Sequence, residues 1–185
     1  LISSGSPLHA HERIAVRERL TNNYFEYYAS TEGGGISILA PNYQKDHPDS
    51  VGRPVFRVDL QIVDENHQVL GPNELGHVRY KGPGVAQWFF RDDDAAKKAF
   101  RDGFFYPGDL GVVDSQGFLT LKGRSKDVII RGGVNIYPTE IERIVAALDI
   151  VSECCVFPVP EKSLGEDIGI AVVLEPAVSK DAAHS

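Results

Sequence analysis

Methionine is absent from the 185 residues, and cysteine occurs only twice. Because no residue can start translation, we expect an internal piece of a longer protein. The two cysteines, Cys154 and Cys155, are adjacent, and neighbouring side chains on a strand point to opposite faces, so a disulfide between them would be strained. No second cysteine pair exists to complete a zinc site. We therefore expect both thiols to contribute to packing rather than to redox chemistry.

Long apolar runs are also lacking. No run approaches the roughly 20 residues that a helix needs to cross a bilayer, and no targeting peptide is evident. We therefore expect a cytoplasmic protein without a transmembrane segment.

Basic residues are in the minority, because 19 Lys and Arg stand against 26 Asp and Glu, for a net charge of −7. A nucleic-acid partner would require a clustered basic face, and the only basic cluster, from Arg124 to Arg131, is short and mixed. The six histidines show neither i, i+4 spacing nor a cysteine partner. The sequence thus disfavours nucleic-acid binding, and no histidine is assigned to catalysis.

The chain is 42% hydrophobic and long enough to bury one or two cores. The alternation of apolar and polar residues, together with the turn-forming residues, predicts most of its elements. They are a charged helix over 8–20, a loop over 28–32, a connector over 41–54, a strand over 56–62, a short helix over 92–98 and a strand pair over 112–121 that turns at 114–117. The strand over 56–62 begins a β-rich subdomain, which residues 78–80 continue.

Residues 123–142 are the most informative stretch. Two short β-prone runs, Val128–Ile130 and Val134–Ile136, flank Gly132 and Gly133, and two adjacent glycines permit a tight hairpin. Pro138 suits the first position of a helix. Apolar residues then recur at helical spacing, at Ile141, Ile144, Val145 and Leu148. The stretch therefore predicts a hairpin followed directly by a helix.

This stretch resembles the start of the small C-terminal domain in the adenylate-forming superfamily, which includes acyl-CoA synthetases, firefly luciferase and the adenylation domains of peptide synthetases. Residues 27–33 are similar to the family's Tyr-Gly-x-Thr-Glu motif, and residues 103–110 to its aromatic-x-Thr-Gly-Asp motif. Gly52-Arg53-Pro54 and residues 71–76 lie between these motifs, as in the family. Because the motifs follow the family's order, the resemblance covers roughly residues 3–174.

The resemblance implies an α+β multidomain fragment. Residues 1–123 would form the C-terminal part of the large AMP-binding domain, with a β-rich subdomain over about 50–122. Residues 124–185 would form the hinge and part of the small α/β C-terminal domain. The family's Ser/Thr/Gly-rich phosphate loop and its distal glycine-lysine are not found, so we expect the piece alone not to form acyl-adenylate.

The family activates acids: a carboxylate attacks the α-phosphate of ATP, and a thiol, usually that of coenzyme A, then displaces AMP from the acyl-adenylate. The resemblance implies that Asp109 accepts hydrogen bonds from the ribose hydroxyls and that Arg124 approaches the same ribose. It implies that Tyr28 offers its ring to adenine, Thr31 its hydroxyl to the α-phosphate, and Glu32 an oxygen ligand to Mg²⁺. Without the resemblance, these residues are a turn aspartate, a solvated arginine and part of an aromatic cluster.

Small residues and a lysine complete the implied site. Gly5 and Ser6 resemble the turn whose backbone flanks adenine, although an ordinary turn before a helix explains them equally. The resemblance places Lys126 at the hinge about which the family's small domain rotates, and implies that Gly132-Gly133 would pass beside the pantetheine arm of coenzyme A. A linker and a plain β-turn are the alternatives for these two features.

Two positions depart from the family pattern. Pro107 replaces the usual threonine and removes a hydroxyl and an amide donor, and Ala86-Gln87-Trp88 replaces a Gly-Tyr turn. The leading hypothesis is an acyl- or aryl-acid:CoA ligase that uses a small-molecule carboxylic acid, ATP, Mg²⁺ and coenzyme A. The alternatives are an adenylating enzyme with another acceptor, like a peptide synthetase or luciferase, and a non-catalytic nucleotide-binding remnant.

Overall fold

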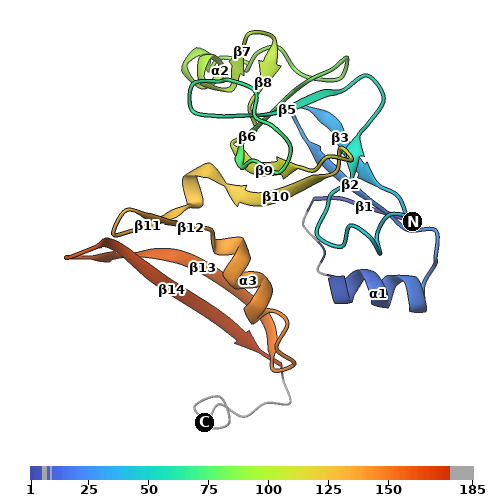
Figure 1. Cartoon of the computed structure of the whole chain (residues 1–185), viewed down its shortest axis with the longest axis vertical. Coiled ribbons are helices and arrows are strands. Elements are labelled where there is room, and N and C mark those ends of the chain that lie inside the picture. The colour runs from blue at the N-terminus through green and yellow to red at the C-terminus, as the bar shows by residue number, and fades with distance from the viewer. Residues whose placement is uncertain (6–7, 9, 176–185) are drawn as a thin grey trace. The chain divides into compact units, whose positions relative to one another are not determined.

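The computed structural model describes residues 1–5, 8 and 10–175 and divides the chain into two compact units, Leu1–Leu121 and Lys122–Ser185. The division lies close to the boundary expected after residue 123. Among the described residues, three α-helices and three β-sheets occur (Figure 1), so the predicted α+β class is confirmed. None of the helices in these residues has the length and apolar character needed to cross a membrane.

The first sheet of the Leu1–Leu121 unit has the strand order β1-β2-β3-β4. Its strands are β1 (Ile2–Ser3), β2 (Phe25–Ser30), β3 (Gly34–Leu39) and β4 (Arg53–Pro54). β1 runs parallel to β2, and the other pairs are antiparallel. The helix expected over 8–20 is present as α1 (Ala10–Arg19) and connects β1 to β2.

A buried ion pair joins α1 to β2. The Arg13 Nε donates to the Glu26 Oε2 at 2.5 Å, and the two side chains are only 7% and 4% exposed. Arg13 also donates to the carbonyl oxygens of Pro48 and Ser50. Because a buried charge without a partner is costly, this network ties the helix, the strand and the 41–54 connector to one arrangement.

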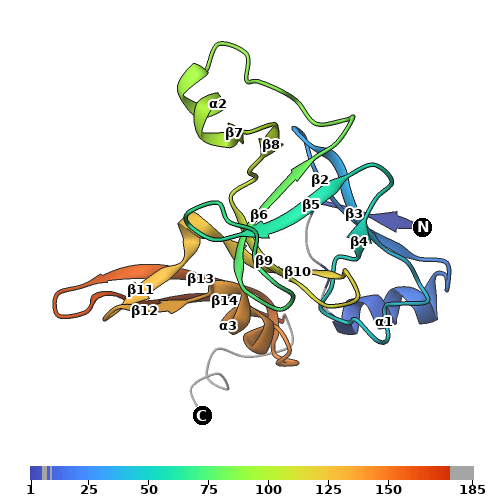
Figure 2. The ribbon, with the colours of Figure 1, turned by 45° about the horizontal axis from the view of Figure 1, so that its top comes forward.

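The second sheet has the order β10-β9-β6-β8-β7, and β5 also pairs with β6 (Figure 2). Its strands are β5 (Asp59–Val63), β6 (Gly76–Lys81), β7 (Phe100–Arg101), β8 (Phe104–Phe105), β9 (Asp109–Val113) and β10 (Leu119–Arg124). The predicted short helix is α2 (Asp93–Ala99), which Asp92 caps by accepting from the Ala95 N–H. The strand pair that turns at 114–117 is also confirmed as β9 and β10.

Two boundaries differ from the prediction. The strand expected over 56–62 begins only at Asp59, because Arg57 has a positive φ of 66° and the Val58 N–H bonds to the Val55 carbonyl in a turn. Phe56 is consequently 91% exposed instead of core-facing. The loop expected over 28–32 was also wrong in part, since Tyr28 to Ser30 belong to β2 and pair with β3.

The core of the first unit lies between its two sheets. Seven buried residues form one cluster, namely Ile36, Val51, Ile62, Val78, Tyr80, Phe105 and Leu119. They come from β3, β5, β6, β8, β10 and the connector before β4. Burial of this apolar surface is the main source of stability for the unit, at about 25 cal/mol per Å² removed from water.

The second unit holds the sheet β12-β11-β14-β13 and the helix α3. Its elements are the short 3-10 helix η1 (Ser125–Asp127), β11 (Ile129–Arg131), β12 (Val134–Ile136), α3 (Pro138–Val145), β13 (Val151–Glu161) and β14 (Gly165–Leu174). The predicted hairpin is confirmed, with φ values of 59° and 85° at Gly132 and Gly133. The helix is confirmed from Pro138 but ends at Val145, before the expected Leu148.

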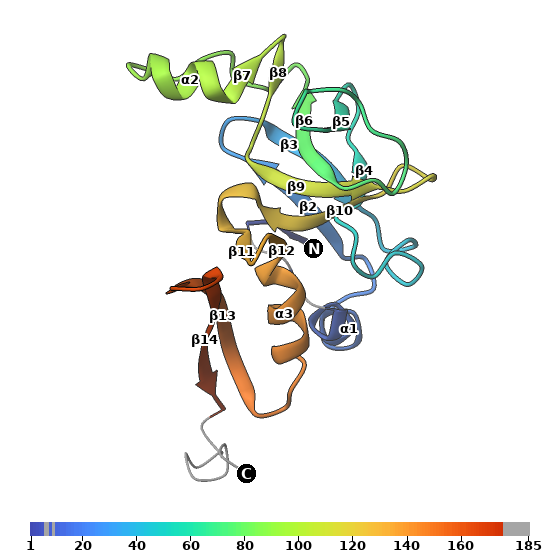
Figure 3. The same ribbon diagram turned by 60° about the vertical axis from the view of Figure 1, so that its left-hand side comes forward.

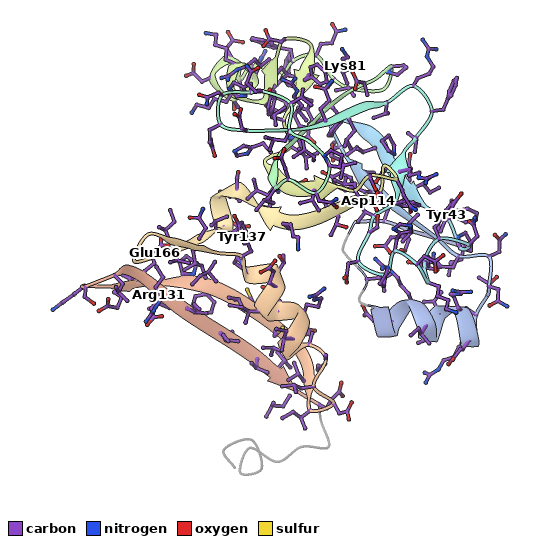
Figure 4. All side chains as sticks on the ribbon, viewed as in Figure 1. Tyr43, Lys81, Asp114, Arg131, Tyr137 and Glu166 are labelled. Atoms are coloured by element: carbon purple, nitrogen blue, oxygen red, sulfur yellow. The ribbon has the colours of Figure 1, made fainter. Side chains whose placement is uncertain are left out.

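α3 lies along β13 (Figure 3), and the Glu142 Oε1 accepts from the Val156 N–H at 2.8 Å. Cys154 is half-buried, its Sγ donates to the Glu142 carbonyl, and burial raises the pKa of its thiol. Cys155 is exposed, and both cysteines are free thiols. At the other end of the sheet, Arg131 bonds to Asp167 at 2.9 Å, and the neighbouring Glu166 accepts from the Ile130 N–H (Figure 4).

Candidate functional site

A three-residue turn joins β2 to β3 and carries two of the predicted site residues. Ser30 pairs with Gly34 across the hairpin, so the turn consists of Thr31, Glu32 and Gly33. Gly34 has a φ of 61°, the left-handed conformation that closes three-residue hairpins of this kind. The Thr31 side chain is exposed and that of Glu32 is half-buried. The turn therefore presents a hydroxyl and a carboxylate at the end of the sheet.

Tyr28 and Asp109 lie against each other although 81 residues separate them. The Tyr28 hydroxyl donates to the Asp109 Oδ2 at 2.5 Å. Asp109 is the first residue of β9 and follows Gly108, whose φ of 83° turns the chain into the strand. The structure thus brings together the residues that the resemblance assigns to adenine and to ribose.

Gly5 lies near the end of the first sheet at which β2 reaches Tyr28 and the Thr31-Glu32 turn. β1 runs parallel to β2 with Ser3 opposite Glu26, so the chain leaves β1 in the direction in which β2 continues to Tyr28. Gly5 has a φ of 104°, which a residue with a side chain rarely adopts. Ser6, its predicted companion, lies outside the described residues.

A buried tyrosine behind the turn was missed by the sequence reasoning. Tyr80 lies on β6 and is 0% exposed, and its hydroxyl lies 2.9 Å from the Ser30 Oγ, which accepts from the Gly33 N–H at 2.9 Å. Alternation along β6 identified Tyr80 as a strand residue. A buried tyrosine usually needs a hydrogen-bond partner for its hydroxyl, so the strand pattern alone could have marked Tyr80 as a candidate. The sequence does not show that the partner is Ser30.

The environment of Tyr80 predicts a pH dependence of stability. Burial is the main cause that raises its pKa from 10.0 to about 12; the Ser30 hydrogen bond opposes this, and the charges of Glu32 and Asp109 add to it. Because the folded chain holds the phenol proton more tightly than the unfolded chain, this contribution is complete below the unfolded pKa and is lost as the pH rises toward 12. We expect the free energy of unfolding to fall by about 1.4 kcal/mol per pH unit in this window.

Urea unfolding at several pH values, followed by the fluorescence of Trp88, measures this slope in the first unit, because the chain has one tryptophan. Tyr80→Phe is the reference, since it keeps the ring and leaves every other tyrosine in place. The slope above pH 10 should be steeper in the unchanged protein than in Tyr80→Phe. Equal slopes would show that folding does not raise the pKa of the Tyr80 hydroxyl.

The remaining predicted residues belong to the second unit. Arg124 ends β10 with an exposed side chain, and Lys126 is exposed on η1 directly after it. Gly132 and Gly133 form the tip of the β11–β12 hairpin. A Cβ atom on Gly132 would lie 3.1 Å from the Leu164 Cδ2, whereas one on Gly133 would meet no atom within 4 Å.

The donors near the turn suit a nucleotide-borne magnesium ion. Mg²⁺ is commonly held by one or two carboxylates together with substrate phosphates and water. Glu32 offers one such carboxylate from the turn between β2 and β3. The residues present therefore fit an ion that a nucleotide brings with it.

A separate hollow of about 340 Å³ lies in the first unit. Its walls come from the segment after β6 and from the β7–β8 turn, and include Lys81, Ala86, Gln87 and Arg101. None of the predicted site residues lines it, and we assign it no part in the chemistry. Two residues of its wall, Ala86 and Gln87, belong to the segment that replaces the family's Gly-Tyr turn.

Comparison with known proteins agrees with the motifs. The family model for AMP-binding enzymes matches residues 1–90. The chain is 34% identical over 184 residues to the long-chain-fatty-acid–CoA ligase of Salmonella typhimurium, covering 98% of this chain and 33% of that protein. It is 38% identical over 143 residues to the 2-succinylbenzoate–CoA ligase of Geobacillus sp., covering 77% and 29%. The chain thus spans about a third of the length of the curated relatives it matches.

Solved structures agree as well. o-Succinylbenzoate CoA synthetase from Bacillus subtilis in complex with its acyl-adenylate intermediate superposes with a TM-score of 0.88 at 32% identity, covering 98% of this chain and 37% of that one. The same enzyme with ATP and magnesium ion gives 0.86 at 31% identity, covering 99% and 38%. The amide bond synthetase McbA from Marinactinospora thermotolerans gives 0.90 at 27% identity, covering 99% and 37%. With its motifs in the family's order, this chain therefore belongs to the adenylate-forming superfamily of AMP-binding enzymes.

Proposed function

We propose that the chain is part of an AMP-forming acid:CoA ligase, which converts ATP and a carboxylic acid to an acyl-adenylate and then to an acyl-CoA and AMP. The observation that carries the proposal is the contact of Tyr28 with Asp109 beside the Thr31-Glu32 turn. The CoA ligases among the relatives support this class of reaction. Their acids differ, since one relative is named for long-chain fatty acids and another for 2-succinylbenzoate, so the proposal extends to the class and not to one acid.

In the first half-reaction, this chain binds and orients the nucleotide. The Asp109 carboxylate accepts hydrogen bonds from the ribose hydroxyls while Tyr28 holds one of its oxygens. The Tyr28 ring and the Gly5 backbone flank the adenine, and Thr31 donates its hydroxyl to the α-phosphate. Glu32 would hold Mg²⁺, and the bound ion would neutralise the charge of the phosphates. Ser6 has the adenine-flanking role that the motif implies.

In the second half-reaction, the second unit contributes. Arg124 contacts the ribose, and the exposed Lys126 on η1 is the hinge residue that follows it. The side-chain-free tip at Gly132 and Gly133 lets the pantetheine arm of coenzyme A pass close to the backbone. The thiol then attacks the acyl carbon, the bond between that carbon and the phosphate oxygen breaks, and AMP leaves.

A second candidate is an adenylating enzyme with a different acceptor. It is favoured by the TM-score of 0.90 with an amide bond synthetase, whose name assigns it an amine acceptor in place of a thiol. The nucleotide-binding residues would keep the same roles. Only the acceptor that enters beside Gly133 would differ.

The test uses the full-length enzyme that carries this chain, with a panel of carboxylic acids that includes a long-chain fatty acid and 2-succinylbenzoate. We expect acid-dependent release of pyrophosphate and, with coenzyme A, stoichiometric AMP and acyl-CoA. Release of AMP from the acyl-adenylate with an amine but not with coenzyme A as acceptor would instead establish the second candidate. Nucleotide binding with no pyrophosphate release for any acid would identify a non-catalytic protein.

A further inference from the structure

The hydroxyl of Tyr80 reaches the turn that carries Thr31 and Glu32. Its oxygen lies 2.9 Å from the Ser30 Oγ, where either hydroxyl can donate, and the Ser30 Oγ accepts from the Gly33 N–H at 2.9 Å. Ser30 and Gly33 are the residues that flank Thr31 and Glu32 on either side. The phenol and the serine thus form a chain of hydrogen bonds across the base of the turn.

The ring of Tyr80 also fills the space beneath the turn. A Cβ atom on Gly33 would lie 2.0 Å from the Tyr80 hydroxyl oxygen, so glycine is required there by the ring itself. The ring is held in place in turn, because Tyr80 is paired with Phe105 across the sheet and their rings meet edge to face at 5.6 Å. The hydroxyl therefore has one position relative to Ser30.

A third contact closes the other side of the turn. The Glu32 carbonyl accepts from the Ala86 N–H at 2.7 Å. Ala86 follows β6, the strand that carries Tyr80, within six residues of it along the chain. The backbone of Glu32 is therefore attached to the same strand region as the phenol, and the turn has little freedom left.

We propose that Tyr80 and Ser30 are positioning residues that fix the Thr31-Glu32 turn in the arrangement needed to bind the α-phosphate and its magnesium ion. The inference rests on the proposed function, since it assigns these tasks to Thr31 and Glu32. A buried phenol between a strand and a turn can serve folding alone. A positioning role can be told from a purely structural one by the Mg²⁺ concentration that gives half-maximal rate. Only a positioning role would change this concentration, because the turn presents Glu32, the proposed Mg²⁺ ligand.

The protonation state of the phenol is compatible with this role. Burial raises the pKa of Tyr80 to about 12, so the hydroxyl keeps its proton near neutral pH. It can therefore donate to Ser30 or accept from it without carrying a charge beside Glu32.

The test compares single hydroxyl deletions in the full-length enzyme. We expect Tyr80→Phe to lower kcat/KM for ATP in acid-dependent pyrophosphate release by roughly threefold to tenfold, the usual effect of one neutral hydrogen bond. It should also raise the Mg²⁺ concentration for half-maximal rate. The release of AMP by coenzyme A from preformed acyl-adenylate should be affected less, because the pyrophosphate whose charge Mg²⁺ would neutralise has already left.

Tyr24→Phe is the matched control. Tyr24 is also 0% exposed, and its hydroxyl also bonds to a serine, Ser3, at 2.5 Å. Tyr24 precedes β2, whereas Thr31 and Glu32 follow the opposite end of that strand, so loss of the Tyr24 hydroxyl should leave the Mg²⁺ dependence unchanged. Ser30→Ala should reproduce the Tyr80→Phe effect, and the double variant should be no worse than Ser30→Ala alone, since both changes break one chain.

The outcomes separate this inference from the function on which it rests. If the unchanged enzyme releases no pyrophosphate with any acid of the panel, the proposed function fails and takes the inference with it. If Thr31→Ala and Glu32→Gln leave an existing pyrophosphate release unchanged, the turn has no role in the first half-reaction and the inference is overturned. If they impair it while Tyr80→Phe and Ser30→Ala match Tyr24→Phe in Mg²⁺ dependence, only the inference is overturned. If Tyr80→Phe does not fold, Ser30→Ala tests the inference by the same Mg²⁺ dependence, because Ser30 is only half-buried and its substitution disturbs the fold less.

Discussion

Asp109→Ala in the full-length enzyme is expected to lower ATP utilisation by roughly tenfold to a hundredfold or more, measured as kcat/KM for ATP in acid-dependent pyrophosphate release. The change removes the charged acceptor for the ribose hydroxyls, and hydrogen bonds to a charged group are worth about 1.5–3 kcal/mol each. It also leaves the Tyr28 hydroxyl without the carboxylate to which it donates. The loss should therefore exceed that of Tyr28→Phe, which spares the carboxylate.

Asp59→Ala provides the comparison for this variant. Asp59 is the first residue of β5, as Asp109 is of β9, and both strands belong to the same sheet. Its carboxylate faces Lys81 at 3.4 Å at the surface, so its removal should not affect ATP use. An Asp109→Ala protein that remains folded by circular dichroism and uses ATP normally would refute the ribose assignment.

Gly133→Leu is expected to separate the two half-reactions. If the hairpin tip passes beside the pantetheine arm, a bulky side chain there should slow CoA-dependent release of AMP by about tenfold or more while acid-dependent pyrophosphate release in a single turnover is largely retained. A Cβ atom on Gly133 meets no atom of the chain within 4 Å, so the side chain should obstruct the incoming arm and not the fold.

The strain of the substitution must be distinguished from obstruction. Gly133 has a φ of 85°, where a leucine is strained by about 1–2 kcal/mol. Gly117 in the β9–β10 turn has the same φ and the same open surroundings, so Gly117→Leu carries equal strain at a site without a proposed role. Equal losses in both half-reactions, or the same loss in Gly117→Leu, would make the Gly132-Gly133 tip a structural turn only.

Local signals were sufficient for the elements whose cause is local. The glycine pair predicted the β11–β12 hairpin because both positions need positive φ, and Pro138 predicted the start of α3 because its missing N–H is tolerated there. The alternation from Phe56 to Ile62 predicted a strand, but it carries no information on backbone φ. The positive φ of Arg57, which the sequence does not reveal, is the reason why β5 begins only at Asp59.

The site was predictable as a set of residues and not as an arrangement. The motifs singled out Tyr28, Glu32 and Asp109, yet the contact between Tyr28 and Asp109 joins two sheets across 81 residues, which spacing cannot reveal. The pairing of Ser30 with Tyr80 across 50 residues is invisible for the same reason. Long-range contacts depend on strand order, and strand order came only from the structure.

The two thiols on β13 offer labelling positions in the second unit. Near neutral pH a maleimide dye should react first with Cys155, since it is exposed, whereas Cys154 is half-buried and its raised pKa leaves less thiolate. These 185 residues hold no other cysteine, so Cys154→Ser leaves Cys155 as their single labelling position. A second cysteine introduced on the surface of the first unit would then allow energy transfer between two dyes to test whether the second unit rotates about Lys126 when nucleotide is added.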